Sequence, residues 1–224
     1  MSHARWALFA LSFILATLYG SPVKDWALGD GPAWAVAAFK ASSIALLALI
    51  AAIARGPRLL VAALLFGALG DALLAPGSEA MFLAGAGSFM IGHLFYIVLF
   101  TRSRETNALR TPWRALSIVA LAAAALLSTN LLVPRESTLF APLSIYTGVL
   151  TFMVMSSVLL PRRGALATIG AVLFFISDGF VAANMFHPQS DPTLAFWLSF
   201  SGWMIYWAGQ AGLCLGGLTL GERR

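Results

Sequence analysis

The sequence predicts an all-α polytopic membrane protein, and its composition and its spacing of apolar runs carry that prediction. Of the 224 residues, 60% are hydrophobic and 10% are charged, whereas an average soluble domain has about 25% charged residues. At about 25 to 28 residues for each helix with its connection, this length accommodates roughly eight membrane-spanning helices and no separate soluble domain. We therefore expect residues 1–224 to form a single transmembrane domain.

Short polar connections divide the chain into eight apolar segments. Each has close to the ~20 residues that cross a hydrocarbon core of ~30 Å. We expect spans at residues 5–20, 33–54, 58–75, 79–100, 113–133, 138–160, 165–186 and 194–219. The first span also has the short length and flanking residues of a cleaved signal peptide. Because further spans follow it, a retained first helix is the preferred interpretation.

The positions of the basic residues predict the orientation of these spans. Lys24 and Arg135 fall on one side of the predicted membrane. The opposite side receives Arg5, Arg55, Arg58, Arg102, Arg104, Arg110, Arg114, Arg162, Arg163, Arg223 and Arg224. Cytoplasmic loops are the ones rich in Lys and Arg, so we expect both termini in the cytoplasm and the protein in the cell (inner) membrane. The net charge of +5 then reflects membrane topology, and no nucleic-acid partner is expected.

Three ionisable residues lie inside predicted spans rather than in loops: Lys40, Asp71 and Asp178. Such a group near the bilayer centre costs about 2.5–3.5 kcal/mol on insertion scales. At 1.5 Å per residue, the two aspartates lie roughly 18–20 Å from the cytoplasmic ends of their helices, and Lys40 lies about 10 Å in from the other side. Tyr146 enters from that side to about 12 Å. The four side chains therefore share one layer in the outer half of the membrane.

This polar layer has a structural and a functional interpretation. A Lys–Asp ion pair could fix helix packing, and Tyr146 could bond a backbone carbonyl. However, Lys40 cannot neutralise both Asp71 and Asp178, so we expect one of the two carboxyl groups to be protonated or solvated. A neutral carboxyl group beside an ionised one is the arrangement that general acid–base catalysis uses.

Two pairs of short motifs predict an internal repeat. Residues 70–75 (Gly-Asp-Ala-Leu-Leu-Ala) are similar to residues 177–182 (Ser-Asp-Gly-Phe-Val-Ala), and residues 92–96 and 202–206 share a G-x-x-x-Y spacing. The paired spans lie four apart and run in the same direction. We therefore expect a parallel 4+4 repeat, with one aspartate from each half facing a shared cavity.

Further polar residues are candidates for a supporting or substrate-binding role. His93, at mid-span, could bind a headgroup, relay a proton or bond a backbone carbonyl. Gln210 lies one turn past Tyr206, and Asn184 lies two turns past Asp178 near the membrane exit. The complete set of supporting candidates is Lys40, His93, Tyr96, Tyr146, Ser177, Asn184, Tyr206 and Gln210.

The motifs of several common enzyme classes are missing. The sequence contains no G-x-S-x-G elbow, no H-E-x-x-H and no glycine-rich phosphate loop. Three histidines and the single Cys214 make a metal site improbable, and no cofactor is expected. The remaining chemistry would have to use carboxylates, a lysine, phenols and water.

The polar landmarks follow one another in a recognisable order along nearly the whole chain. They are Lys40, Gly70-Asp71, residues 92–96 (Gly-His-Leu-Phe-Tyr), Tyr146, residues 174–178 (Phe-Phe-Ile-Ser-Asp), Tyr206 and Gln210. In this combination and spacing the sequence resembles the YhhN-like lysoplasmalogenase family of eight-helix membrane proteins. One departure is Ala41, because the family often has proline after this lysine.

The resemblance implies hydrolysis of the vinyl ether bond of lysoplasmalogens, which are membrane lysophospholipids, to a fatty aldehyde and glycerophospho-ethanolamine or -choline. It also implies that no cofactor is needed. Protonation of the vinyl ether gives an oxocarbenium ion that water attacks, which requires one carboxylic acid, one carboxylate and one water. Our hypothesis is that Asp71 and Asp178 supply these groups. Lys40 would then keep the second carboxylate ionised, while Tyr146 and Tyr206 orient water or the ether oxygen.

Two other functions fit the residue pattern. A proton-coupled small-molecule transporter also carries mid-membrane carboxylates and an internal repeat. A hydrolase of another lysolipid could use the same scaffold. The oligomeric state is not predicted by the sequence.

Overall fold

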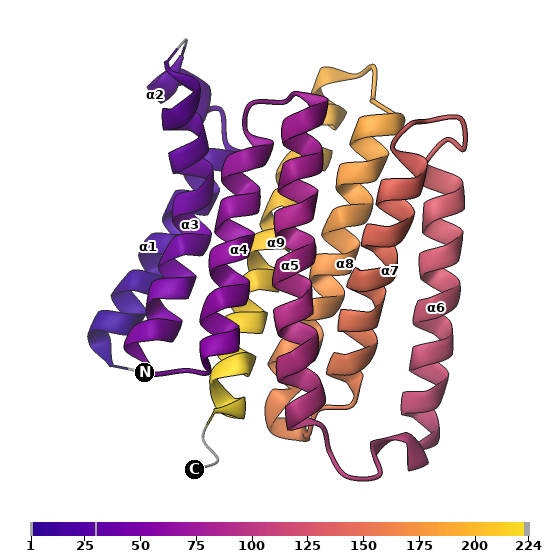
Figure 1. The fold of residues 1–224 in the computed structure, drawn as a ribbon. Coiled ribbons are helices and arrows are strands. Elements are labelled where there is room, and N and C mark those ends of the chain that lie inside the picture. The colour runs from indigo at the N-terminus through magenta and orange to yellow at the C-terminus, as the bar shows by residue number, and fades with distance from the viewer. Residues whose placement is uncertain (1, 30, 222–224) are drawn as a thin grey trace.

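The computed structural model of the protein describes residues 2–29 and 31–221, and in this part of the chain all regular structure is helical. Long helices lie side by side and run alternately up and down (Figure 1). The α-helices are α1 (His3–Gly20), α2 (Val23–Leu28), α3 (Ala33–Ile53), α4 (Arg58–Leu74), α5 (Glu79–Ser103), α6 (Pro112–Leu132), α7 (Phe140–Val158), α8 (Ala165–Phe186) and α9 (Pro192–Leu220). Two 3-10 turns, η1 (Ala108–Arg110) and η2 (Arg162–Gly164), precede α6 and α8. The all-α prediction is confirmed.

The long helices coincide with the expected spans to within a few residues at each end. By length and composition, five helical segments can cross a membrane, namely α3, α5, α6, α7 and Arg162–Phe186. The other long helices are α1, α4 and α9, with 18, 17 and 29 residues. That these three also cross the membrane, which would make eight spans, stays a prediction, and so does the 4+4 repeat.

Several helix boundaries follow from local sequence. Proline occupies the first helical position of α6 and of α9, where its missing N–H has no helical partner to lose. The Asp191 side chain accepts hydrogen bonds from the backbone N–H groups of Thr193 and Leu194, and Ser78 accepts one from Met81. The short helix α2 was not predicted, because its six residues are too few to show a helical pattern.

The basic side chains gather at one end of the bundle. In Figure 1, α1 begins and α9 ends at this end, where α3 also connects to α4, α5 to α6, and α7 to α8. Within the described residues, it carries Arg5, Arg55, Arg58, Arg102, Arg104, Arg110, Arg114, Arg162 and Arg163, whereas Lys24 and Arg135 lie at the other end. Arg223 and Arg224 lie outside the described residues. The expected segregation of charge is thus present, and its assignment to the cytoplasm stays a prediction.

Glycines lie in the two most extensive helix contacts, which are those of α8 with α9 and of α4 with α5. A Cβ atom added at Gly170 would lie 2.5 Å from the backbone oxygen of Gly209 and the backbone nitrogen of Leu213. On the α4–α5 side, a Cβ atom added at Gly85 would lie 3.1 Å from the backbone oxygen of Gly70. These two helix pairs carry most of the polar residues described next.

Helix α6 contrasts with this centre, because it lies at the edge of the bundle and packs mainly on α7 (Figure 1). Its large apolar side chains are 60–69% exposed at Leu116, Val119, Leu126, Leu127 and Leu131. Such a uniformly apolar, uncovered surface is typical of a helix that faces lipid.

Candidate active site

Asp71 and Asp178 each accept a hydrogen bond from a tyrosine on a different helix. The hydroxyl of Tyr146 on α7 donates to Asp178 Oδ2 on α8 over 2.5 Å. The hydroxyl of Tyr206 on α9 donates to Asp71 Oδ2 on α4 over 2.8 Å. Asp71 is 2% exposed, whereas Asp178 is half-buried. The sequence motifs are similar, but the two carboxyl groups have different surroundings.

A chain of buried hydrogen bonds leads to Asp71. Tyr96 on α5 donates to Gln210 Oε1 over 3.2 Å, and Gln210 Nε2 donates to the Tyr206 oxygen over 3.2 Å. Gln210 and Tyr206 lie four residues apart on one face of α9, as expected from the sequence. Every hydrogen atom in this chain points toward Asp71, so the network stabilises negative charge on that carboxyl group.

His93 on α5 belongs to the other pair. Its Nε2 atom lies 3.2 Å from the Tyr146 oxygen. Because Tyr146 donates its only hydroxyl hydrogen to Asp178, Nε2 of His93 must be the donor in this contact. The Nδ1 atom of His93 is buried and has no hydrogen-bond partner within the described part of the chain. Of the three roles expected for His93, bonding a backbone carbonyl is therefore wrong.

Two phenylalanines link the Asp71 and Asp178 pairs. The ring of Phe174 on α8 packs edge-on against His93, with centroids 4.8 Å apart, and against Tyr206 at 5.3 Å. The ring of Phe89 on α5 packs against Phe174 and Tyr206, at 5.9 Å in both cases. Neither phenylalanine was a predicted site residue. Phe174 belongs to the landmark at residues 174–178 and lies one turn before Asp178, whereas the position of Phe89 one turn before His93 is its only sequence signal.

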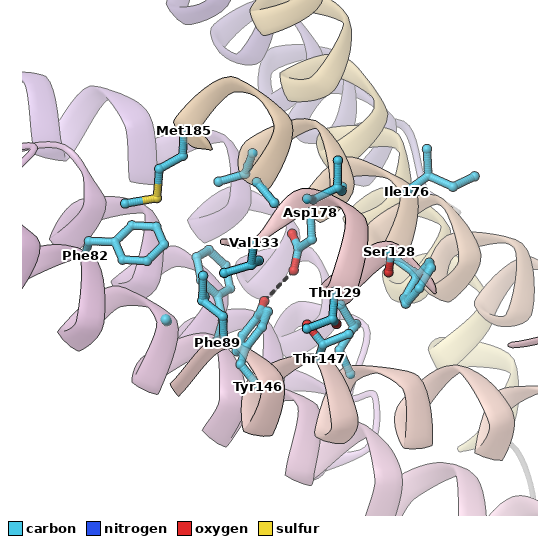
Figure 2. A pocket seen from close by; sticks show the side chains of 18 of the residues that line it. Phe82, Phe89, Ser128, Thr129, Val133, Tyr146, Thr147, Ile176, Asp178 and Met185 are labelled. Atoms are coloured by element: carbon cyan, nitrogen blue, oxygen red, sulfur yellow. Dashed lines mark hydrogen bonds between the residues drawn. The ribbon is translucent and has the colours of Figure 1, made fainter. Parts of the chain in front are cut away.

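A cavity of about 180 Å³ reaches only one of the two pairs. It lies between α6, α7 and α8 on one side and α4 and α5 on the other, and most of its lining side chains are apolar. Asp178 and Tyr146, joined by their hydrogen bond, lie between Phe82 and Met185 on one side of the view and Ser128 and Ile176 on the other (Figure 2). Asp71 is not among the residues that line this cavity, although a cavity shared by both aspartates was expected. Phe89 lines it instead and covers Gly70, the neighbour of Asp71.

Lys40 does not form the ion pair with an aspartate that the structural interpretation of the polar layer requires. Within the described residues, its ammonium group has no carboxylate partner within 4.0 Å, and it lies 5.8 Å from the centroid of the Trp203 ring. That ring packs against Tyr206 at 5.4 Å. Trp203 also lines a second cavity, which lies between α9 and residues 19–25 and contains no part of either aspartate pair. The charge of Lys40 is therefore held by an aromatic ring, one ring away from the Asp71–Tyr206 pair.

Two other predicted site residues are turned away from the two pairs. The hydroxyl of Ser177 donates to the backbone oxygen of Phe174, in its own helix, over 2.7 Å. Asn184 Nδ2 donates to the hydroxyl of Ser199 over 3.4 Å and so joins α8 to α9. Neither lines the cavity. Within residues 2–29 and 31–221, no three His, Cys, Asp or Glu side chains come together in a way that could hold a metal ion.

All residues of this site fall within a segment that matches a known family. Residues 35–217 match the model of the YhhN family. The chain belongs to the YhhN family. The resemblance inferred from the order of the polar landmarks is thereby confirmed, and the site described above is that of a YhhN protein.

Curated relatives of this YhhN protein include proteins named lysoplasmalogenase from Mycobacterium bovis and Mycobacterium tuberculosis. Each is 34% identical to the chain over 154 residues, which is 66% of this chain and 59% of the relative. The matched region thus spans less than two thirds of the relatives' length. No solved structure matches the chain.

Proposed function

We propose that this YhhN protein hydrolyses the vinyl ether bond of lysoplasmalogen, releasing a fatty aldehyde and glycerophospho-ethanolamine or -choline. The observation that carries the proposal is a half-buried carboxyl group, Asp178, held by Tyr146 in the middle of an apolar cavity. An acid in such a place can reach the reactive bond of a lipid while most water is excluded. The names of the mycobacterial relatives support the same substrate.

The first chemical step is a proton transfer to carbon. In the protonated form, the Asp178 carboxyl group gives its proton to the vinyl carbon that does not bear oxygen. The double bond supplies the electron pair for the new C–H bond, and the positive charge is shared between the other vinyl carbon and the ether oxygen. The carboxylate that remains stabilises this oxocarbenium ion across the cavity.

The second step consumes one water. The water oxygen attacks the oxocarbenium carbon, and its proton passes to the Asp178 carboxylate. In the hemiacetal formed in this way, the new hydroxyl group loses its proton and the bond from its carbon to the glycerol oxygen breaks. This gives the aldehyde, and the glycerol oxygen takes up a proton and leaves as a hydroxyl group. The balance is one vinyl ether and one water in, and one aldehyde and one alcohol out. Tyr146, whose hydrogen bond fixes one carboxyl oxygen, leaves the other free to exchange the proton.

Phe89 and Phe174, here called the aromatic wall, lie between Asp71 and the cavity. Asp71 supports the site through this wall, as a positioning residue. It fixes the hydroxyl of Tyr206, whose ring packs against both Phe89 and Phe174. Lys40 supplies a compensating positive charge from the far side of Trp203. The sequence hypothesis gave both Asp71 and Asp178 a direct part in the reaction, one as the acid and the other as the carboxylate. In the present proposal Asp178 is the acid at the substrate, and Asp71 is a buried carboxylate that positions the aromatic residues.

The orientation proposed from the basic residues places the site near the outer face. In this proposal, all eight long helices cross the cell membrane as a single domain. Their arginine-rich end lies in the cytoplasm. The cavity residues lie toward the opposite ends of their helices, as Leu74, Phe82 and Met185 indicate. A single-chain phospholipid of the outer leaflet could then present its vinyl ether at the depth of Asp178.

Purified protein in detergent micelles tests the proposal directly. Aldehyde release is measured from a lysoplasmalogen, its saturated ether and its ester counterpart, for the wild type, Asp178→Asn and Asp71→Asn. We expect aldehyde from the vinyl ether alone, a loss of about 10²- to 10⁴-fold in Asp178→Asn, and a smaller loss in Asp71→Asn. The exposed Glu136→Gln is the matched acid-to-amide control and should behave as wild type.

Two results would overturn the proposal. Hydrolysis of the ester but not of the vinyl ether would indicate another lysolipid hydrolase. Absence of any product from folded wild type, together with substrate uptake in proteoliposomes, would indicate a transporter.

A further inference from the structure

Gly179 directly follows the proposed acid and lines the same cavity. A Cβ atom added at Gly179 would meet no other atom within 4 Å. Glycines at the α8–α9 contact are needed for close helix packing, because a Cβ at Gly170 or Gly212 would lie within 3.0 Å of backbone atoms. Gly179 therefore has no packing role, and the space beside it belongs to the cavity.

Glycine is an unfavourable residue in a helix interior, and Gly179 lies well inside α8. In the similar motif of α4, the corresponding residue is Ala72. A methyl group is thus compatible with the helical Asp-containing turn. What distinguishes the α8 turn is the cavity in front of it, which an alanine side chain would enter beside the Asp178 carboxyl group.

The cavity opens toward the lipid-facing surface. Its volume of about 180 Å³ gives room for a short run of carbons beside Asp178. Three of its lining side chains, Ile176, Val181 and Met185, are 40–47% exposed. The uncovered helix α6 forms one wall. A bound chain would therefore enter from the bilayer, with only its first few carbons inside.

We propose that this cavity binds the vinyl ether and the adjoining carbons of a single unbranched chain, and that Gly179 is the specificity-determining residue that keeps room for them beside Asp178. The inference rests on the proposed function. The protein then discriminates between substrates by their bulk near the reacting bond and not by their total chain length, because the distal carbons stay in the bilayer.

Graded substitution at Gly179 tests this inference, with Gly148 as the matched control. Gly148 lies in the α7 interior, has no atom within 4 Å of an added Cβ, and does not line the cavity. Gly179→Ala, →Val and →Leu are compared with the same changes at Gly148. We expect kcat/KM to fall progressively in the Gly179 series, by about 10- to 100-fold per step of added bulk, and to stay unchanged in the Gly148 series. The melting temperature should be unchanged or higher in both alanine variants.

Binding of a saturated ether lysolipid, which cannot react, separates this inference from the proposed function. We expect wild type and Gly148→Leu to bind it equally, and Gly179→Leu to bind at least about tenfold more weakly. If wild type binds the ether lipid but releases no aldehyde from lysoplasmalogen, the proposed function fails. If folded Gly179→Val and Gly179→Leu hydrolyse and bind as wild type does, the role of Gly179 is wrong.

Substrate shape provides a second, independent readout. For the wild type, straight chains of about 12 to 18 carbons should be hydrolysed at rates within a few-fold of one another, because the cavity takes up only the carbons nearest the reacting bond and the distal carbons stay in the bilayer. A methyl branch next to the double bond should be rejected, whereas the same branch at the far end of the chain should be tolerated. Equal rejection of both branched substrates would contradict the proposed cavity occupant.

Discussion

The ring of Phe89 packs edge-on against the ring of Tyr206, with centroids 5.9 Å apart, and its other side lines the cavity. Phe89 therefore separates Asp71 from the cavity that contains Asp178. The two carboxyl groups, which occupy similar sequence motifs, therefore differ in their access to the cavity. In the proposed mechanism, Asp178 contacts the substrate, whereas Asp71 acts through the aromatic residues between it and the cavity.

This separation predicts a difference in chemical reactivity. A hydrophobic carbodiimide enters apolar cavities and reacts with protonated carboxyl groups, so it should modify Asp178 well before Asp71 in the wild type. Phe89→Ala should make Asp71 reactive as well. Peptide mass spectrometry after timed labelling measures both sites. Equal labelling of the two aspartates in folded wild type would contradict the wall that Phe89 forms.

Tyr146→Phe removes the hydrogen bond to Asp178 while keeping the ring. A hydrogen bond to a charged group contributes about 1.5–3 kcal/mol, so we expect kcat for aldehyde release to fall by about 10- to 100-fold. Because Asp178 keeps its position on α8, KM should change little. Tyr19→Phe, at a tyrosine outside both aspartate pairs, is the matched control and should leave kcat unchanged. An unchanged kcat in Tyr146→Phe would remove Tyr146 from the site.

His93 should act as a hydrogen-bond donor to Tyr146 rather than as a proton relay. Glutamine can supply an N–H to the Tyr146 oxygen, whereas leucine cannot. We therefore expect His93→Gln to keep kcat within about tenfold of wild type and His93→Leu to lose more, in line with one lost hydrogen bond. Rate measurements from pH 5 to 9 check the role further, because the pH profile of His93→Gln should match that of wild type. A Gln variant as inactive as the Leu variant would point to proton transfer through the imidazole instead.

Gly170→Ala should destabilise the protein through the contact between α8 and α9. The added Cβ would lie 2.5 Å from backbone atoms of α9, which cannot move as a flexible side chain can. Overpacking of this kind costs typically 1–3 kcal/mol. Thermal unfolding in detergent should show a lower melting temperature than wild type. Gly87→Ala, with no atom within 4 Å of the new Cβ, is the control and should show no decrease.

The helices could be predicted from the sequence because apolar runs and polar breaks are local signals. The positions of Lys40, Asp71 and Asp178 inside those runs could be predicted for the same reason. Which tyrosine meets which aspartate could not, because this depends on the lateral arrangement of α4, α7, α8 and α9, which hydropathy does not encode. The correspondence of Gln210 with Tyr206 was predictable, since both lie on one helix face.

Each residue that sequence reasoning missed or misplaced has its own physical explanation. Phe89 and Phe174 look like any lipid-facing phenylalanine in an apolar sequence. Lys40 was expected beside a carboxylate, but the face of Trp203 stabilises a cation as well. Ser177 was expected to face the site, yet its hydroxyl bonds within its own helix, a competition that serine often wins locally.

The exposed position of α6 means that, if the proposed reaction takes place beside Asp178, the surrounding bilayer lies against one wall of its cavity. One wall of the cavity is a helix with lipid on its outer side. The lateral pressure and the hydrophobic thickness of the bilayer therefore act directly on the space in front of Asp178. Detergent replaces that outer layer with a softer one. Reconstitution into membranes of graded thickness is therefore a way to tune turnover without changing a single residue of the protein.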